Sequence, residues 1–175
     1  MWLNSGTRFV FPSEFSKTKR EIHVDGEIFI DVAHNPETPF IVHAQEIHIS
    51  VQGTSFNIKA YRDETQRTVV LVEGKVKIET EHHQMIELSP NEKIDVAGRN
   101  ISRETVDVSE FISWKNGILV LKKTPISDIF KQIGRYYNIQ FKEISNVALG
   151  DRTYSGKLFL SESLNNSAKD RKSVV

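Results

Sequence analysis

Histidines are the side chains of this 175-residue chain best suited to binding a metal ion, and there are six of them. His43 and His48 are five positions apart, and His82 and His83 are adjacent. On a continuous strand, side chains an odd number of positions apart point to opposite faces of the sheet. Neither pair is therefore expected to direct two imidazoles at one ion, and we predict no metal site and no bound cofactor.

Carboxylates that could act as an acid and base pair occur in one short segment. Asp25, Glu27 and Asp31 alternate with apolar residues and would share one face of a strand, with His23 at its start. Acid and base catalysis by two carboxyl groups requires one of them to be partly removed from water. A row of this kind is more typical of a solvated strand face, which is how we interpret it.

A nucleophilic residue is equally hard to find. The segment Gly53-Thr54-Ser55-Phe56-Asn57 resembles half of a nucleophile elbow, but Asn57 replaces the second glycine and no helical pattern follows. The chain has no cysteine, which excludes thiolate catalysis and thiolate metal ligands. We therefore predict that the chain is not an enzyme.

The composition is that of a soluble globular protein of one or two small domains. There are 23 basic and 23 acidic residues, so the formal net charge is zero, and 38% of the residues are hydrophobic. Nucleic acid is not an expected partner, because phosphate binding requires a basic excess. No run of 18 apolar residues occurs, so no membrane span is predicted within the given chain.

The elements that must position any site are mainly strands up to residue 108. Apolar residues alternate with polar ones from residue 21 to 33 and again from 47 to 60, with a change of phase at Gly53 that we interpret as a β-bulge. Polar residues 81–84 and the segment 88–92 are predicted to form turns. We predict a mainly antiparallel β domain at residues 1–108 with twisted sheets, either a sandwich or a solenoid-like arrangement.

The pattern after residue 108 predicts a small α+β domain. Ser109 is expected to cap a short helical turn that ends at Gly117, and Thr124 and Pro125 are expected to begin a helix over residues 125–137. Strands predicted at residues 118–121 and 139–142 form a β-α-β unit with this helix, and residues 152–160 are expected to add another strand. This domain is assigned to residues 109–164, incomplete at its C-terminus, and residues 165–175 are expected to be a disordered tail.

Several short phrases, in their order along the chain, indicate a family. They are Trp2-Leu3-Asn4-Ser5-Gly6-Thr7, Gly26-Glu27, Pro39-Phe40-Ile41-Val42, Gly53-Thr54-Ser55-Phe56-Asn57, Val72-Glu73-Gly74-Lys75-Val76, Leu88-Ser89-Pro90-Asn91-Glu92 and Trp114-Lys115-Asn116-Gly117. Together they resemble the periplasmic region of the FecR family of membrane-bound anti-sigma factors, in the form common in Bacteroidetes. The part from about Trp114 is similar to the small β-α-β domain that follows the FecR domain in these proteins and is related to secretin and TonB short N-terminal domains.

The resemblance implies the periplasmic region of a single-pass inner-membrane protein. In such a protein, this region would contact the signalling domain of a TonB-dependent outer-membrane transporter. A cytoplasmic segment would bind an extracytoplasmic-function sigma factor. Both ends of the chain look cut relative to the family, so the sigma-binding segment and the transmembrane segment, its one link to the membrane, are expected to be absent from it.

Strand addition at an open edge of the small domain is the expected mode of partner binding. The candidate contact residues lie on the two strands predicted after the helix: Ile139, Gln140, Phe141, Lys142, Thr153, Tyr154, Lys157 and Leu158. The sequence is also compatible with two other kinds of function. One is a β module that binds a glycan or another small ligand without a signalling role, and the other is a structural domain that self-associates through a sheet edge.

Overall fold

A computed structural model describes residues 1–141 and 152–160 of the chain. The chain divides into two compact units, Met1–Ile112 and Ser113–Val175.

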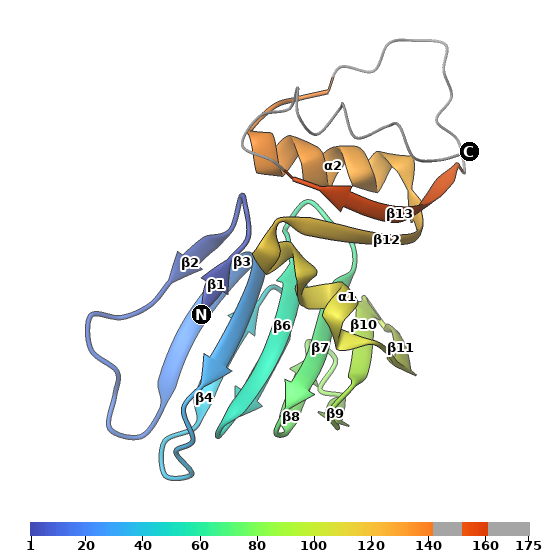
Figure 1. The fold of residues 1–175 in the computed structure, drawn as a ribbon. Coiled ribbons are helices and arrows are strands. Elements are labelled where there is room, and N and C mark those ends of the chain that lie inside the picture. The colour runs from blue at the N-terminus through green and yellow to red at the C-terminus, as the bar shows by residue number, and fades with distance from the viewer. Residues whose placement is uncertain (142–151, 161–175) are drawn as a thin grey trace. The chain divides into compact units, whose positions relative to one another are not determined.

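The first unit is built from one mixed, curled β-sheet and a short helix (Figure 1). The strand order is β11-β10-β7-β6-β3-β4-β5-β8-β9, and β1 and β2 also pair with β3. In the described residues, β3 and β4 run parallel and the other pairs of this sheet are antiparallel. The elements are β1 (Trp2–Leu3), β2 (Arg8–Val10), β3 (Arg20–Val32), β4 (Phe40–Ala44), β5 (Ile47–Val51), β6 (Thr54–Ala60), β7 (Arg67–Glu73), β8 (Val76–Thr80), β9 (Met85–Leu88), β10 (Glu92–Ala97), β11 (Asn100–Thr105) and α1 (Val108–Ile112).

The long strand β3 organises this sheet. Its first residues, 20–23, pair with β4, whereas residues 26–32 pair with β6. One strand therefore joins the two halves of the sheet, and the apolar residues on the inner faces of both halves meet in a single core. Side chains with essentially no exposure in this core include Ile22, Ile28, Val42, Ile49, Phe56, Ile58, Val69, Leu71, Ile78 and Ile94.

The phase change at Gly53 is a turn between two strands, so the predicted β-bulge at this position is wrong. Strand β5 lies between β4 and β8, whereas β6 lies between β3 and β7, and the two strands do not pair. The apolar residues that face the core are at odd positions in β5 and at even positions in β6. This difference explains the change of phase in the sequence pattern. Gly53 is required for another reason, because a Cβ there would lie 2.7 Å from the Cα of His34.

Both predicted turns are present. Residues 81–84 connect the paired strands β8 and β9, as expected for the tip of a hairpin. The turn after Leu88 connects β9 to β10, and Asn91 adopts a positive φ of 65° within it. Asparagine tolerates this left-handed conformation better than most residues, which is why it serves here.

The short helix α1 begins at a different cap from the one predicted. The side chain of Asp107, and not that of Ser109, accepts a hydrogen bond from a backbone N–H of the first turn, at 3.0 Å from Ser109 N. Asp107 precedes the helix by one residue, the position where a carboxylate can accept from free N–H groups. Gly117, with φ of 71°, ends the helical segment as predicted.

The second unit contains η1 (Ser113–Asn116), β12 (Ile118–Pro125), α2 (Ile126–Tyr137) and β13 (Thr153–Phe159). Strands β12 and β13 form an antiparallel two-stranded sheet, and α2 lies along it (Figure 1). The helix starts one residue later than predicted: Pro125 is its N-cap, and the hydroxyl of Thr124 instead accepts from Lys122 N at 3.1 Å. A mainly β region followed by a small α+β region is therefore confirmed.

The strand predicted at residues 139–142 is wrong for Ile139, Gln140 and Phe141, which have no strand structure. Asn138 adopts a left-handed φ of 52°, and Ile139 N donates to the carbonyl of Gly134 at 2.9 Å. These are the bonds of a Schellman cap, so this segment completes the helix instead of entering a sheet. Lys142, the last residues of the predicted small domain at 161–164, and the tail at 165–175 lie outside the described residues.

Candidate functional site

Strand β13 carries four of the predicted contact residues: Thr153, Tyr154, Lys157 and Leu158. Its pairing with β12 places Leu158 opposite Leu119 and Lys157 opposite Val120. No strand of the described residues pairs with the other edge of β13. An unpaired edge presents a row of backbone N–H and C=O groups that can accept a further strand.

The register identifies which backbone groups of β13 point away from β12. Leu160 N donates to the carbonyl of Gly117 at 2.7 Å, which makes that pair a hydrogen-bonded one. Hydrogen-bonded and non-hydrogen-bonded pairs alternate in an antiparallel ladder. Leu158 therefore bonds to β12, whereas the N–H groups of Lys157 and Phe159 are directed to the open edge.

The two faces of this small sheet differ in exposure to solvent. Leu119 and Leu121 are buried, and Leu158, opposite Leu119, is half-buried on the same face. Lys157 and Phe159 are exposed on the opposite face. The open edge therefore adjoins a surface that combines an exposed aromatic ring with a positive charge.

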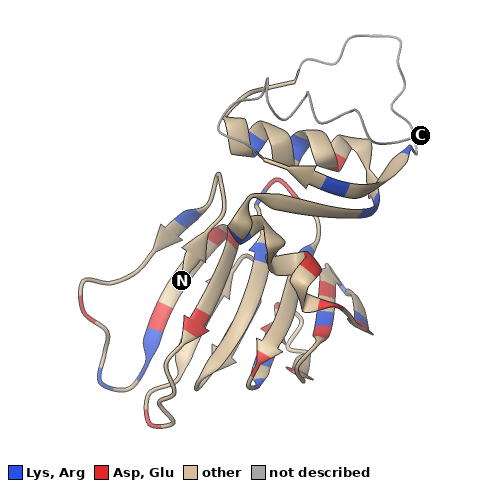
Figure 2. Ribbon diagram, viewed as in Figure 1, with Lys and Arg blue, Asp and Glu red and all other residues tan. Residues whose placement is uncertain are grey.

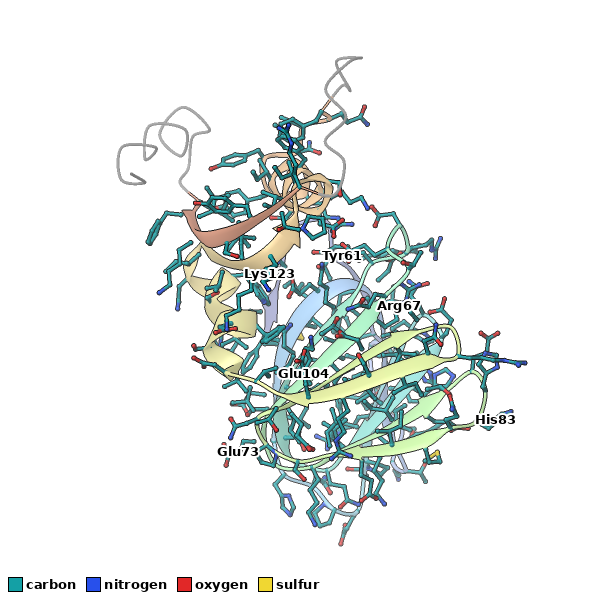
Figure 3. All side chains as sticks on the ribbon, turned by 90° about the vertical axis from the view of Figure 1, so that its right-hand side faces the viewer. Tyr61, Arg67, Glu73, His83, Glu104 and Lys123 are labelled. Atoms are coloured by element: carbon teal, nitrogen blue, oxygen red, sulfur yellow. The ribbon has the colours of Figure 1, made fainter. Side chains whose placement is uncertain are left out.

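A bulge that no sequence pattern indicated interrupts β12. The register shifts between Leu121 and Thr124, and Lys123 adopts a left-handed φ of 46° with its N–H bonded to the hydroxyl of Ser155 at 2.8 Å. Figure 3 labels Lys123 in the second unit. The left-handed conformation of Lys123 is rare for a residue other than glycine. The bulge places two exposed lysines, Lys122 and Lys123, opposite Ser155 of β13.

Of the other predicted contact residues, Ile139, Gln140 and Phe141 do not form part of a sheet edge. Ile139 and Phe141 are exposed to 37% and 45%, and the ring of Phe141 lies 4.7 Å from that of Phe130 on α2. Phe141 thus lies against the helix, as expected for the chain segment that follows its cap. Whether this segment touches a partner stays a prediction, and it would do so with side chains and not by strand pairing.

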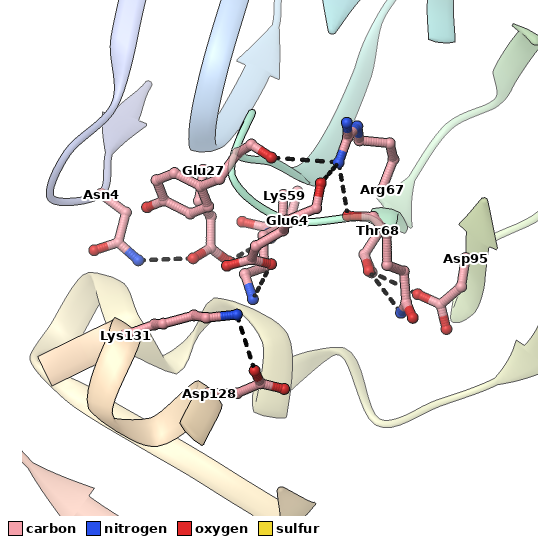
Figure 4. A network of polar contacts seen from close by, with 12 residues as sticks. Asn4, Glu27, Lys59, Glu64, Arg67, Thr68, Asp95, Asp128 and Lys131 are labelled. Atoms are coloured by element: carbon pink, nitrogen blue, oxygen red, sulfur yellow. Dashed lines mark hydrogen bonds and ion pairs between the residues drawn. The ribbon is translucent and has the colours of Figure 1, made fainter. Parts of the chain in front are cut away.

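The acidic row of the first unit serves the fold, and Figure 4 shows its residue Glu27 with Asn4. Glu27 accepts hydrogen bonds from the amides of Asn4 at 2.7 Å and Asn57 at 3.1 Å. Burial raises the pKa of Glu27, and the charge of Lys59 and the two amide donors oppose this rise. Asn4, Glu27 and Asn57 belong to three of the phrases that indicated the family. Those phrases therefore encode the attachment of the N-terminal segment to the sheet.

The two neighbouring carboxylates also have structural partners. Asp31 accepts from the hydroxyl of Ser55 at 2.7 Å, and Asp25 accepts from the backbone N–H of Arg62 at 2.9 Å. Ser55, the serine of the incomplete elbow, therefore lies in a strand and bonds to a carboxylate on the neighbouring strand. Basic and acidic residues are interspersed over the strands of the first unit (Figure 2).

His43 and His48 lie together, so the prediction that they point to opposite faces is wrong. Residues 45 and 46 form a two-residue turn, and the two histidines lie directly opposite each other on β4 and β5, with their Nδ1 atoms 2.8 Å apart. The alternation of apolar residues on both sides of Gln45 and Glu46 is the sequence signal for this hairpin.

His83 lies at the tip of the β8–β9 hairpin (Figure 3). Among the described residues, no group of three or more His, Cys, Asp or Glu side chains has a geometry suited to a metal ion.

Two family models match the chain. The model described as FecR protein matches residues 1–77, and the model described as FecR, C-terminal, matches residues 118–167. None of the curated proteins compared with this chain matches it.

Two crystal structures of a candidate anti-sigma factor from Parabacteroides distasonis ATCC 8503 are similar to this chain. Both are 31% identical in sequence with a TM-score of 0.85, and both alignments cover 96% of this chain. They cover 79% of the relative in the structure at 1.65 Å resolution and 78% in the structure at 2.50 Å.

The fold and these similarities define a regulatory protein of the anti-sigma factor class. The chain belongs to the FecR family, whose members are membrane-associated anti-sigma factors. In the part of the chain that the structure describes, no helix is long and apolar enough to cross a membrane.

Proposed function

We propose that this chain is the periplasmic sensor region of a membrane-bound anti-sigma factor. It receives a signal by direct contact with the signalling domain of a TonB-dependent outer-membrane transporter. A transmembrane segment and a cytoplasmic segment outside the chain pass the signal to an extracytoplasmic-function sigma factor. The chain acts through protein contacts and performs no catalysis.

The open edge of β13 is the observation that carries this proposal. It lies within residues 118–167, the range matched by the C-terminal family model. An edge of seven residues can form several backbone hydrogen bonds with an added strand, and the alternate side chains select the partner. Lys157 and Phe159 offer a charge and a ring for this selection.

A proline substitution tests the edge. Lys157→Pro removes an N–H that points to the open edge and leaves the bonds of Leu158 to β12 in place. The probe is the purified signalling domain of the TonB-dependent transporter that is the proposed partner, titrated calorimetrically. We expect binding to weaken by about tenfold or more, because an added strand loses a backbone bond and meets the proline ring.

Lys157→Ala is the matched control, because it removes the same charge and keeps the N–H. It should bind the signalling domain within a fewfold of the unsubstituted chain, and an amide NMR spectrum should show that both variants stay folded. Equal affinities for the proline and alanine variants would remove this edge from the proposal. Failure of the unsubstituted chain to bind the signalling domain would refute the proposed function itself.

A further inference from the structure

A row of three imidazoles crosses the outer face of the first unit. His23 on β3 is in register with His43 on β4, and His43 is in register with His48 on β5. Residues in register on neighbouring strands place their side chains on the same face. His23 and His48 are exposed, and the side chain of His43 is 27% exposed. The proposed contact with the transporter's signalling domain does not use these side chains.

Two of the three rings converge. The Nδ1 atoms of His43 and His48 are 2.8 Å apart. Two imidazole nitrogens at this separation share a single proton, and a metal ion can take the place of that proton. Two nitrogens bound to one tetrahedral zinc ion, each at about 2.05 Å, are about 3.3 Å apart. The rings therefore need to separate by about half an ångström to admit the ion.

A carboxylate lies on the other side of His43. Oε1 of Glu21 is 3.6 Å from Nε2 of His43, and Lys19 holds the same oxygen at 2.8 Å. The distance to His43 is longer than a hydrogen bond, but the negative charge of the carboxylate favours the imidazole tautomer with its proton on Nε2, which leaves Nδ1 as a ligand. Carboxylate, imidazole and metal in this sequence are a common arrangement around protein-bound metal ions.

His23 does not contribute a third ligand in this arrangement. Its ring stacks on that of His43, with centroids 4.7 Å apart and planes inclined by 21°. A stacked ring presents its face, and not its nitrogen lone pair, to the neighbour. On the other side of the row, Glu79 is in register with His48, and its carboxylate contacts His83 at 3.1 Å.

We propose that His43 and His48 form a two-imidazole chelate for a late first-row divalent cation of the class Zn²⁺, Ni²⁺ and Cu²⁺, with water completing the coordination shell. Imidazole suits these cations, and Cu²⁺ is expected to bind most tightly. Glu21 is a positioning residue that orients His43. The exposed position of the row gives the ion and its waters access from solvent.

Zinc sulfate titrated calorimetrically into the chain of residues 1–175, without an affinity tag, tests the chelate. We expect saturable binding of one ion per chain, and His48→Gln should weaken it by about tenfold or more through the loss of one of two ligands. Glu21→Gln should weaken it by about tenfold, the usual effect of removing an orienting carboxylate. His48 is exposed, so the glutamine variant is expected to keep the fold.

The hairpin tip provides the matched control. His82→Gln combined with His83→Gln removes two exposed imidazoles and should leave the zinc affinity unchanged. A second readout is the electron paramagnetic resonance spectrum of the chain with one equivalent of Cu²⁺, which should report two imidazole nitrogens in the unsubstituted chain and one in His48→Gln. The proposal is overturned if zinc affinity is the same in His48→Gln as in the unsubstituted chain. It is equally overturned if the ion is lost only when His82 and His83 are replaced, or if zinc does not bind.

Discussion

At the scale of single residues, Arg67 connects the loop after β6 to the sheet. Its side chain is only 6% exposed and donates two hydrogen bonds to the carboxylate of Glu46, at 2.8 and 3.1 Å. Its third nitrogen donates to the carbonyls of Tyr61, Glu64 and Gln66. One guanidinium therefore donates to three carbonyls of this loop as well as to the carboxylate.

Replacement of Arg67 by alanine should be strongly destabilising. Arg67→Ala leaves a carboxylate and several loop carbonyls without their donor, and we expect a loss of about 2 to 4 kcal/mol in the free energy of unfolding. Urea unfolding monitored by circular dichroism measures this loss. Arg62, whose side chain is 75% exposed, is the matched control, and Arg62→Ala should cost about 0.5 kcal/mol or less. Equal losses in the two variants would show that the loop is not held by Arg67.

The same pair predicts a dependence of stability on pH. Burial opposes ionisation of Glu46, but hydrogen bonds from Arg67 and from its own backbone outweigh this and lower its pKa. A carboxyl group whose pKa is lower in the folded than in the unfolded state stabilises the fold above the unfolded pKa, and this stabilisation is lost as the pH falls through the folded pKa. Glu46→Gln should therefore be less stable than the unsubstituted chain at neutral pH. The difference should shrink below about pH 4, and urea unfolding at several pH values checks this. A difference that stays constant over this range would contradict the assignment.

At the scale of elements, the long strand β3 depends on a glycine in its middle. Gly26 adopts φ of 140°, and a Cβ there would lie 2.6 Å from the Cα of Thr7. The hydroxyl of Thr7 both accepts from the N–H of Glu27 and donates to its carbonyl, each at 3.0 Å. The segment between β1 and β2 thus packs directly on the backbone of β3, which only glycine permits.

Gly26→Ala should therefore lower the free energy of unfolding by roughly 3 kcal/mol, since the added methyl meets backbone and the conformation is strained. Gly98 is the matched control, because it also has a positive φ, of 59°, but no atom lies within 4 Å of an added Cβ. Gly98→Ala should cost about 1 kcal/mol from backbone strain alone. Thermal and urea unfolding of both variants separate the two contributions. Losses of similar size would mean that the contact with Thr7 contributes little.

At the scale of the whole molecule, we infer that the two compact units are separate domains, with a FecR-like β domain at residues 1–108 and a small α+β domain at 109–164. The division between the two compact units falls between residues 112 and 113, close to this boundary. Hydrogen exchange can distinguish two domains from one, because a core substitution should raise exchange mainly in its own domain.

Ile58→Ala and Leu121→Ala provide this comparison. Ile58 is fully buried in the core of the first unit, and its truncation should cost about 2 to 5 kcal/mol. Leu121 is 4% exposed in the second unit. We expect Ile58→Ala to increase amide exchange in β3, β6 and β7, and Leu121→Ala to increase it in β12, β13 and α2. An equal increase throughout the chain in either variant would argue for one cooperative domain.

Sequence patterns predict the elements of this protein better than they predict which elements are neighbours. The repeat of Ile126, Ile129, Phe130 and Ile133 is sufficient for helix α2, because the spacing of apolar residues on a helix is a local property. The segment from Ile139 is misleading, since an apolar and polar alternation over four residues is also compatible with a helix cap followed by packing on the helix. Gly53 is misleading in the same way, because a change of phase has the same appearance in a bulge and in a turn between two strands.

The two candidate sites differ in how far local sequence patterns predict them. The alternation in β13 is clear enough to place Thr153, Tyr154, Lys157 and Leu158 on a strand, but the direction of each N–H follows from pairing with β12. The histidine row across β3, β4 and β5 has no such local signal, because His23 and His48 come together through His43 and not through their spacing along the chain.

Residue types and their local spacing determined the family, the β character of the first unit, helix α2 and strand β13, since these depend on neighbours within a few positions. Only the tertiary structure decided which strands adjoin, which edge of β13 is open, and that His43 and His48 converge. Strand pairing joins residues distant in the chain, and its free energy depends on a core to which all the strands contribute at once. No single segment carries that information.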